Sequence, residues 1–249
     1  MLLRNELVSF LDNLLQPSAY EDTTFNGLQV EGCEKIEKVG FAVDSSMDVF
    51  RAAFESGCDF LVVHHGLIWG SLKNVASINR ERLKLLLQNE MNLYVSHLPL
   101  DFHPEIGNNI SILRVLGMRK ADFLPELGIA GYVNEPLTVD ELLNSIKLKI
   151  NPESHSISFF CGPQNIFFVS TGAISRGIVE KIHNTGIKTI ITGEANGEST
   201  FYYLLKEFEM NIIFAGHYHT EVFGLLELKR LIEKSFEGKI ETIFIDLPH

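Results

Sequence analysis

The sequence has little positive charge and no long apolar run, and each of these absences excludes a class of protein. Lysine and arginine number 21 against 32 aspartate and glutamate residues, which gives a formal net charge of −11. Nonspecific binding to nucleic acid depends on basic surface that neutralises phosphates, so we do not expect nucleic acid as a partner. No apolar run reaches the roughly 18 residues that a membrane-spanning helix needs, so we expect no membrane contact.

Cysteine is also scarce. The chain has three cysteines, none of them in a Cys-x-x-Cys pair: Cys33, Cys58 and Cys161. The first 15 residues carry Arg4, Glu6 and Asp12 and are followed by no small-residue cleavage site, so they do not resemble a signal peptide. These residues have the apolar spacing of an amphipathic helix. We therefore expect a cytoplasmic protein without disulfide bonds.

Three common catalytic motifs are missing as well. The sequence contains no Walker A motif, no Gly-x-Gly-x-x-Gly after a strand and no Gly-x-Ser-x-Gly. Their absence excludes the usual phosphate-binding loops and the serine hydrolases that carry a nucleophile elbow.

The sequence does contain an internal repeat, in which the same order of predicted strands and helices occurs twice. Residues 38–101 and 165–221 each predict a strand, a turn with serine, a helix closed by glycine (Gly57 or Gly186), a second strand, a second helix and a third strand. Short apolar runs that alternate with helical spacing indicate parallel strands covered by helices. We expect an α/β fold of two related βαβαβ lobes with largely parallel sheets.

Residues 123–162, between the two repeats, predict a further βαβ segment. Thr138 and Glu141 fit a capping box at the start of its helix. We assign this segment to the second lobe, which gives lobes of residues 1–122 and 123–249. The second lobe then includes a closing helix and the last strand, near residues 240–247.

Ligand-type side chains follow several of these strands. His64 and His65 end an apolar strand, where adjacent side chains point to opposite sides, so we expect each to reach a different ion. The alternative is a buried pair of structural histidines. Asp101 is an oxygen donor just beyond the next strand, and a helix-capping role is its alternative. His97 could bind a metal directly or could hold a ligand by a hydrogen bond.

The second repeat ends in a similar motif, His217-x-x-x-Glu221, whose spacing places both side chains on one side of a helix. Glu221 suits a bridging position because one carboxylate can donate an oxygen to each of two metals, although an acid in a first helical turn also favours the helix dipole. His219 points the other way along the turn. Glu194, the counterpart of His65, could be a general base, a hydrogen-bond acceptor or a capping residue.

Together these residues resemble a dinuclear metal site in a cleft between the lobes, near the carboxyl ends of the strands. We expect Asp101 to superpose on Glu221 and His65 to lie near the position of Glu194. Histidine and carboxylate ligands suit Zn, Fe, Mn and Co alike.

Five motifs in order resemble the Nif-three-like family, often named GTP cyclohydrolase 1 type 2 homologues, over essentially the whole chain. The motifs are FNGLQV (25–30), VVHHGL (62–67), SHLPLDFHPEIGNN (96–109), ITGE (191–194) and AGHYHTE (215–221). The chain is similar to the short form, which lacks an insertion domain.

The resemblance implies a site of two divalent metal ions per chain. Its implied ligands are His64, His65, Asp101, His217 and Glu221, with Glu221 as the bridge. It also implies that Asn26 and Gly27 lie near the site and that the chain forms a homohexamer.

We therefore expect a metal-dependent hydrolase that acts on a purine nucleotide such as GTP, with Glu194 as the candidate catalytic residue. The alternative is a non-catalytic metal-binding protein that acts as an oligomeric adaptor or regulator.

Overall fold

The computed structural model describes residues 2–71, 74–124, 127–195 and 198–248. They fold into two compact units. The first unit contains Met1–His103 and Gly224–His249, and the second contains Pro104–Phe223.

These units divide the chain at other positions than the predicted lobes, residues 1–122 and 123–249. Residues 104–118 belong to the second unit, because their helix packs on the second sheet. The last strand returns to the first unit, so its prediction in the second lobe was wrong. Its parallel partner is a strand more than 190 residues away, which periodicity within the last strand cannot reveal.

The first unit contains a five-stranded sheet in the order β13-β4-β5-β6-β2. All neighbouring pairs in it are parallel except β2 with β6. Its elements are β1 (Leu2–Leu3), α1 (Arg4–Leu15), η1 (Pro17–Ala19), β2 (Gly27–Val30), β3 (Lys35–Ile36), β4 (Lys38–Asp44), α2 (Met47–Glu55), β5 (Phe60–His65), α3 (Ser77–Gln88), β6 (Asn92–Val95), α4 (Leu98–Asp101) and β13 (Glu241–Phe244).

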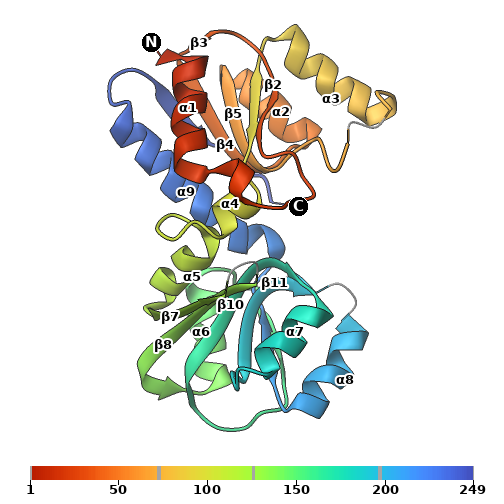
Figure 1. The fold of residues 1–249 in the computed structure, drawn as a ribbon, viewed down its shortest axis with the longest axis vertical. Coiled ribbons are helices and arrows are strands. Elements are labelled where there is room, and N and C mark those ends of the chain that lie inside the picture. The colour runs from red at the N-terminus through yellow and green to blue at the C-terminus, as the bar shows by residue number, and fades with distance from the viewer. Residues whose placement is uncertain (1, 72–73, 125–126, 196–197, 249) are drawn as a thin grey trace. The chain divides into compact units, whose positions relative to one another are not determined.

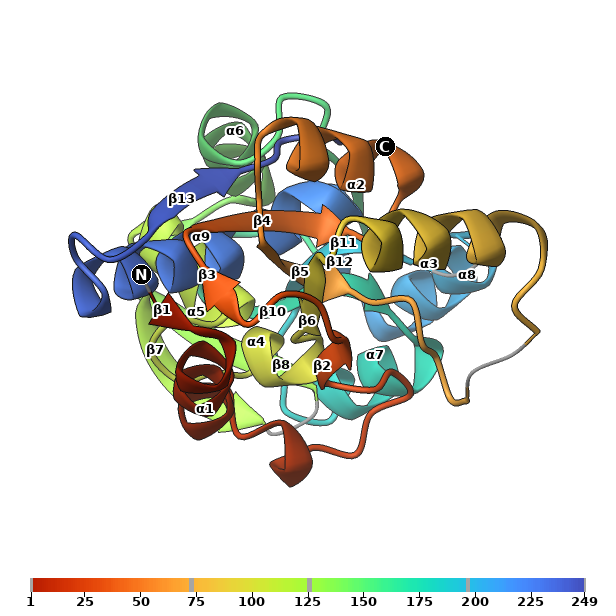
Figure 2. The same cartoon turned by 90° about the horizontal axis from the view of Figure 1, so that it is seen from above.

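Helices cover both faces of this sheet, as Figure 2 shows for α1 and α2. Leu61 and Val63 on β5 pack with Phe50 of α2 and Leu86 of α3. On the other face, the hydroxyl of Tyr94 on β6 donates a hydrogen bond to Asp12 of α1. Because alternate residues of a strand face opposite sides, a strand covered on both faces is apolar throughout.

The second unit contains a six-stranded mixed sheet in the order β7-β8-β10-β11-β12-β9. Only β10, β11 and β12 run parallel to one another, so this sheet is less parallel than expected. Its elements are α5 (Asn108–Leu116), β7 (Arg119–Leu124), β8 (Gly128–Leu137), α6 (Val139–Lys149), β9 (His155–Ser158), β10 (Gln164–Ile174), α7 (Arg176–His183), β11 (Thr189–Ala195), α8 (Glu198–Phe208) and β12 (Asn211–Phe214). Helix α9 (His217–Ser235) begins in this unit and ends in the first.

This sheet is also covered on both faces, by α5 and α6 on one side and by α7 and α8 on the other (Figure 1). Phe167 and Ile191 face the first pair of helices, while Phe168 and Ile190 face the second pair. Thr138 caps α6 in the expected capping box with Glu141. Within the 123–162 segment, β8 pairs with β10 and β9 pairs with β12, so its strands belong to the second sheet.

The predicted repeat is confirmed in the order of its elements. The β4-α2-β5-α3-β6 segment and the β10-α7-β11-α8-β12 segment each place three adjacent parallel strands in one sheet. In the first sheet, Val63 is the last residue of β5 that pairs with β6. In the second sheet, Thr192 is the last residue of β11 that pairs with β12. Two residues further on lie His65 and Glu194, so these two positions correspond, as expected.

The motifs after the third strands match less closely. Counted from the last paired residues of β6 and β12, His97 corresponds to Gly216, and Asp101 corresponds to Thr220. Glu221 lies one residue beyond this position. The two motifs look equivalent in sequence because in each the acid follows the histidine by four positions, but they begin one residue apart relative to their strands.

All three cysteines are free thiols. Among the described residues, no helix is both long and apolar enough to span a membrane.

Candidate metal centre

His64 lies at the end of β5 and is fully buried. Its Nδ1 atom lies 2.8 Å from the backbone oxygen of Ser96. A carbonyl oxygen can only accept a hydrogen bond, so Nδ1 carries the proton and donates it. In the neutral ring the lone pair therefore resides on Nε2, the form in which histidine binds a metal.

His65 is fixed in the same tautomer by a carboxylate. Its Nδ1 atom lies 2.8 Å from Oδ1 of Asp44, at the end of the neighbouring strand β4. The strand pairing explains this contact, because Asp44 and His65 are paired residues of β4 and β5. A carboxylate that accepts from Nδ1 orients the ring and makes Nε2 a better ligand.

His97 follows β6 and is held by the loop between α1 and β2. Its Nδ1 atom lies 3.0 Å from both carboxylate oxygens of Asp22. The side-chain oxygen of Asn26 accepts a hydrogen bond from the backbone amide of His97 (2.7 Å), and the amide nitrogen of Asn26 donates to Asp22 (2.8 Å). Burial alone would raise the pKa of Asp22, but the hydrogen bonds from His97 and Asn26 and the charge of His97 outweigh it and lower that pKa strongly.

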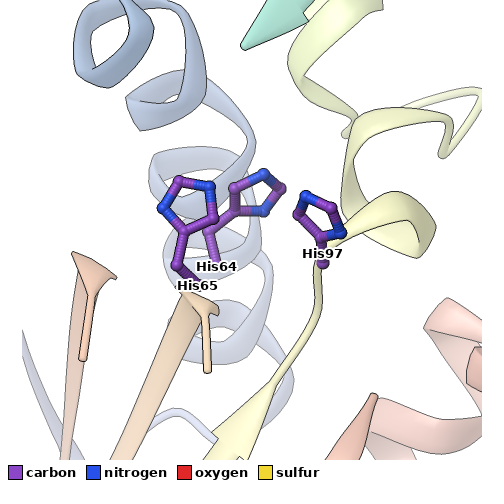
Figure 3. A group of neighbouring side chains, drawn as sticks. All are labelled: His64, His65 and His97. Carbon is purple, nitrogen blue, oxygen red and sulfur yellow. The ribbon is translucent and has the colours of Figure 1, made fainter. Parts of the chain in front are cut away.

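Figure 3 shows the three rings gathered beyond the strands that carry them. One nitrogen from each of His64, His65 and His97 lies within 4.8 Å of the other two, so the group could hold a metal ion. Nitrogen ligands of zinc lie about 2.0–2.1 Å from the ion, which places two such ligands about 3–4 Å apart. The end of β5 brings both rings to one group, so His64 and His65 could also share an ion; that each reaches a different ion stays a prediction.

Asp101 ends the short helix α4 and is buried. Its Oδ2 atom lies 3.4 Å from Nε2 of His64. The predicted carboxylate ligand thus faces the ring nitrogen that the tautomer of His64 makes available.

Gln29 of β2 holds the loop after His65 by hydrogen bonds. Its side-chain oxygen accepts hydrogen bonds from the backbone amides of Leu67 (2.8 Å) and Ile68 (3.1 Å). A Cβ atom at Gly66 would lie 2.5 Å from the side-chain nitrogen of Gln29 and 2.6 Å from Cγ2 of Val95, so any larger residue would displace these side chains. Together with Asn26, this contact gives the FNGLQV motif a role: it fixes His97 and the loop that follows His65.

The second unit carries a histidine–carboxylate group at the start of α9. Nδ1 of His217 lies 3.0 Å from Oε1 of Glu194, and Nε2 lies 3.1 Å from Oε1 of Glu221. Burial alone would lower the pKa of His217, but the hydrogen bonds and charges of Glu221 and Glu194 outweigh it and raise that pKa to about 9. Without a metal, His217 is therefore an imidazolium that holds two carboxylates.

Two glycines make room for this group. A Cβ atom at Gly193 would lie 2.8 Å from both the Cα of His217 and the Oγ1 of Thr220, which itself accepts a hydrogen bond from the amide of Gly172. Gly172 has φ +67°, a conformation that favours glycine, and lies directly against Glu221. The bulge in β10 near Gly172 therefore shapes the backbone around the carboxylate.

Sequence analysis missed the acceptors that orient the rings, Asp22, Asp44 and the backbone of Ser96. Asp44 carried a usable signal, because it ends the strand beside His65. Asp22 lies in a loop without periodicity, so no pattern connects it to His97. His219 belongs to none of the candidate ligand groups among the described residues, in line with its exclusion from the predicted set.

The fold and these groups define an α/β protein with histidine and carboxylate clusters that could bind metal. The chain belongs to the Duf34/NIF3 (NGG1p interacting factor 3) family, whose model matches residues 2–249. The family expected from the sequence motifs is confirmed.

Curated relatives of similar length carry one name. A "GTP cyclohydrolase 1 type 2 homolog" of Pyrococcus abyssi is 38% identical over 250 residues, which cover 98% of each chain. A relative of the same name from Deinococcus radiodurans is 37% identical and covers 94% of this chain and 89% of its own.

Solved structures agree with the fold. A protein described as "ybgI, unknown function" superposes with a TM-score of 0.92 at 29% identity, and covers 100% of this chain and 99% of its own. TTHA1606 from Thermus thermophilus has a TM-score of 0.87 at 33% identity, with the same coverage.

Proposed function

We propose that the protein is a metal-dependent hydrolase that acts on a purine nucleotide, in keeping with the "GTP cyclohydrolase 1 type 2" name of its relatives. The observation that carries the proposal is the shared orientation of four histidines. Each has its Nδ1 atom at a hydrogen-bond acceptor: Ser96, Asp44, Asp22 or Glu194. A histidine that binds a metal through Nε2 almost always donates Nδ1 to such an acceptor, so the shared arrangement supports metal binding.

We further propose that the two groups act together as one dinuclear centre. Its ligands are the five residues that the family resemblance implies: His64, His65, Asp101, His217 and Glu221. His97 is an additional ligand candidate, because its nitrogen belongs to the three-histidine group. Bound divalent ions would supply Lewis-acid polarisation and a lowered pKa for water, the chemistry of two-metal hydrolases.

The side chains of this chain prepare the centre for that chemistry. A histidine bound to a metal through Nε2 adds no charge, so the charge of the ions would be offset by Asp101 and Glu221. Glu194 holds the Nδ1 proton of His217 and is half-exposed, at 54% of its side chain. From this position it can exchange protons with water, which fits the proposed role of a general base.

Substrate binding should depend on the metal. With a formal net charge of −11, the chain repels a nucleotide triphosphate unless cations neutralise the phosphates or polarise the base. Removal of metal should therefore abolish the binding of a nucleotide triphosphate as well as its turnover.

The experiment measures metal content and activity together. Protein purified without added metal or chelator is analysed for Zn, Fe, Mn and Co, and then tested against a panel of purine and pyrimidine nucleotides. Asp101→Asn should retain the fold but lose turnover, while Asp48→Asn, on the exposed start of α2, should retain both. Metal-loaded protein that neither binds nor turns over any nucleotide would favour the adaptor function instead.

A second measurement tests the bridge. If Glu221 binds both ions, Glu221→Ala should lower the content of both, whereas His64→Ala should lower the content of one. The loss of a single ion from Glu221→Ala would contradict the bridging role. The homohexamer implied by the family resemblance stays a prediction, which native mass spectrometry of the full chain can test.

A further inference from the structure

We propose that a surface cavity beside the three-histidine group binds the planar base of the substrate, with the indole of Trp69 as its stacking wall. The identity of that base as a purine rests on the proposed function. The cavity itself lies within the first unit, between the loop after β5 and helix α3.

Trp69 connects the cavity to the candidate metal ligands. Its ring centroid lies 5.1 Å from that of His97 and 6.2 Å from that of His65, and the same indole lines the cavity. A flat molecule stacked on Trp69 would therefore lie one ring away from two histidines of the group.

The cavity has the volume of a small planar molecule. Its volume is about 180 Å³. A protein cavity of roughly 150 Å³ is known to accommodate benzene, so this space suits an aromatic ring. The rest of a nucleotide must extend out of the cavity.

The described lining residues offer apolar walls and hydrogen-bonding side chains. Apolar walls come from Leu83, Val75 and Trp69, and polar side chains come from Ser71, Asn74 and Asn79. The described residues that line the cavity carry no formal charge. Asparagine offers both donors and an acceptor, which match the mixed donors and acceptors on the edge of a nucleobase.

Trp69 is held in place before any ligand arrives. Its indole nitrogen donates a hydrogen bond to the backbone oxygen of Gly66 (2.9 Å), and its backbone forms a bridge with Thr24. Gln29 fixes the two residues before it through their amides. The indole nevertheless remains 39% exposed, as a stacking surface requires. An aromatic surface that is already positioned loses little freedom when a base stacks on it.

Trp69 is also the only tryptophan of the chain, so its fluorescence reports on this site alone. The experiment titrates the metal-free full chain with guanosine, which has a base but no phosphate. We expect saturable quenching by guanosine and none by ribose 5-phosphate, which has a phosphate but no base. Equal quenching by both compounds, or by neither, would overturn the proposal.

Variants locate the bound base. Asn79→Leu and Asn74→Leu leave the reporter intact and should weaken guanosine binding about tenfold, the effect of one lost hydrogen bond. Asn184→Leu, an exposed asparagine at the end of α7 in the other unit, is the matched control and should bind like the wild type. Thermal unfolding followed by circular dichroism checks that each variant is folded.

Unchanged affinity in both folded cavity variants would place the base elsewhere and overturn the proposal. The proposed function is measured separately, by metal-dependent turnover. Guanosine binding without turnover would support the cavity but not the hydrolase. Turnover without guanosine quenching would support the hydrolase but not the cavity.

Discussion

A Cβ atom at Gly172 would lie 2.4 Å from Oε1 of Glu221, closer than any side chain allows. The same position has φ +67°, which side chains other than glycine rarely adopt. Glycine at this bulge of β10 therefore does two things: it permits the backbone conformation, and it leaves the carboxylate its place beside His217.

Gly172→Ala should displace Glu221 and weaken metal binding, because the added methyl group occupies the position of its carboxylate oxygen. The strained backbone should also lower the free energy of unfolding by about 1–2 kcal/mol. Isothermal titration of the apo variant with divalent metal and chemical denaturation measure the two effects.

Gly186→Ala is the matched control for this variant. Gly186 has φ +82°, but an added Cβ would meet nothing within 4 Å. It should lose a similar amount of stability and retain the metal affinity of the wild type. If both variants bind metal equally well, the contact between Gly172 and Glu221 does not matter for the site.

Asp44→Ala should weaken metal binding by about tenfold to a hundredfold, although Asp44 is not itself a proposed ligand. The variant removes the acceptor that holds Nδ1 of His65, so the ring loses its fixed tautomer and orientation. Metal titration compares it with Asp48→Ala, an exposed aspartate four residues away that contacts Arg51. An unchanged affinity in Asp44→Ala would show that the hydrogen bond does not prepare His65 for a metal.

The sequence alone was enough to predict most of the fold, because the predicted strands are buried on both faces and read as apolar runs. The βαβ order and the capping box at Thr138 followed from local patterns, and both are present. The partner of the last strand did not follow from them. The pairing of β13 with β4 depends on contacts between distant residues, which periodicity does not encode.

The sequence was enough to predict the candidate metal ligands of the site. It was not enough to predict the residues that hold these ligands in place. Histidines and acids at strand ends stand out because few other positions put such side chains next to an apolar run. Asp22 and Gln29 act through side-chain hydrogen bonds, Asp22 from a loop and Gln29 from an edge strand. Their roles depend on the three-dimensional path of the chain, so they became visible only in the structure.

The metal-free protein should lose stability as the pH rises through about 9. The pKa of His217 is raised from its ordinary value of 6.5 to about 9 in the folded state. A raised pKa means that the proton stabilises the folded state, so this contribution is complete below about pH 6.5 and disappears above the folded-state pKa. Divalent metal competes with the Nε2 proton, so metal affinity should increase over the same pH range.

Denaturation at several pH values between 6 and 10, with and without metal, measures both trends. His217→Gln should lack the part of the pH dependence that lies between 6.5 and 9. His219→Gln, two residues away and outside the candidate ligand groups, should retain it. A wild type whose stability is flat over this range would contradict the proposed imidazolium.

Asn26→Asp should weaken the hold on His97 while changing very few atoms. In the wild type, the amide nitrogen of Asn26 donates to Asp22, and its oxygen accepts from the backbone of His97. An aspartate would keep the acceptor but would replace the donor with a second negative oxygen, 2.8 Å from the buried carboxylate of Asp22. Two carboxylates this close repel unless one takes up a proton.

We expect a loss of about 1–3 kcal/mol in the free energy of unfolding, the cost of a buried group without its partner. The loss should shrink at low pH, where one carboxylate is protonated, and metal affinity should fall at neutral pH as His97 shifts. Asn13→Asp, on the exposed face of α1, adds the same charge without this contact and should change neither quantity by more than about 0.5 kcal/mol. Equal stability of the two variants across the pH range would show that Asn26 does not bind Asp22 in solution.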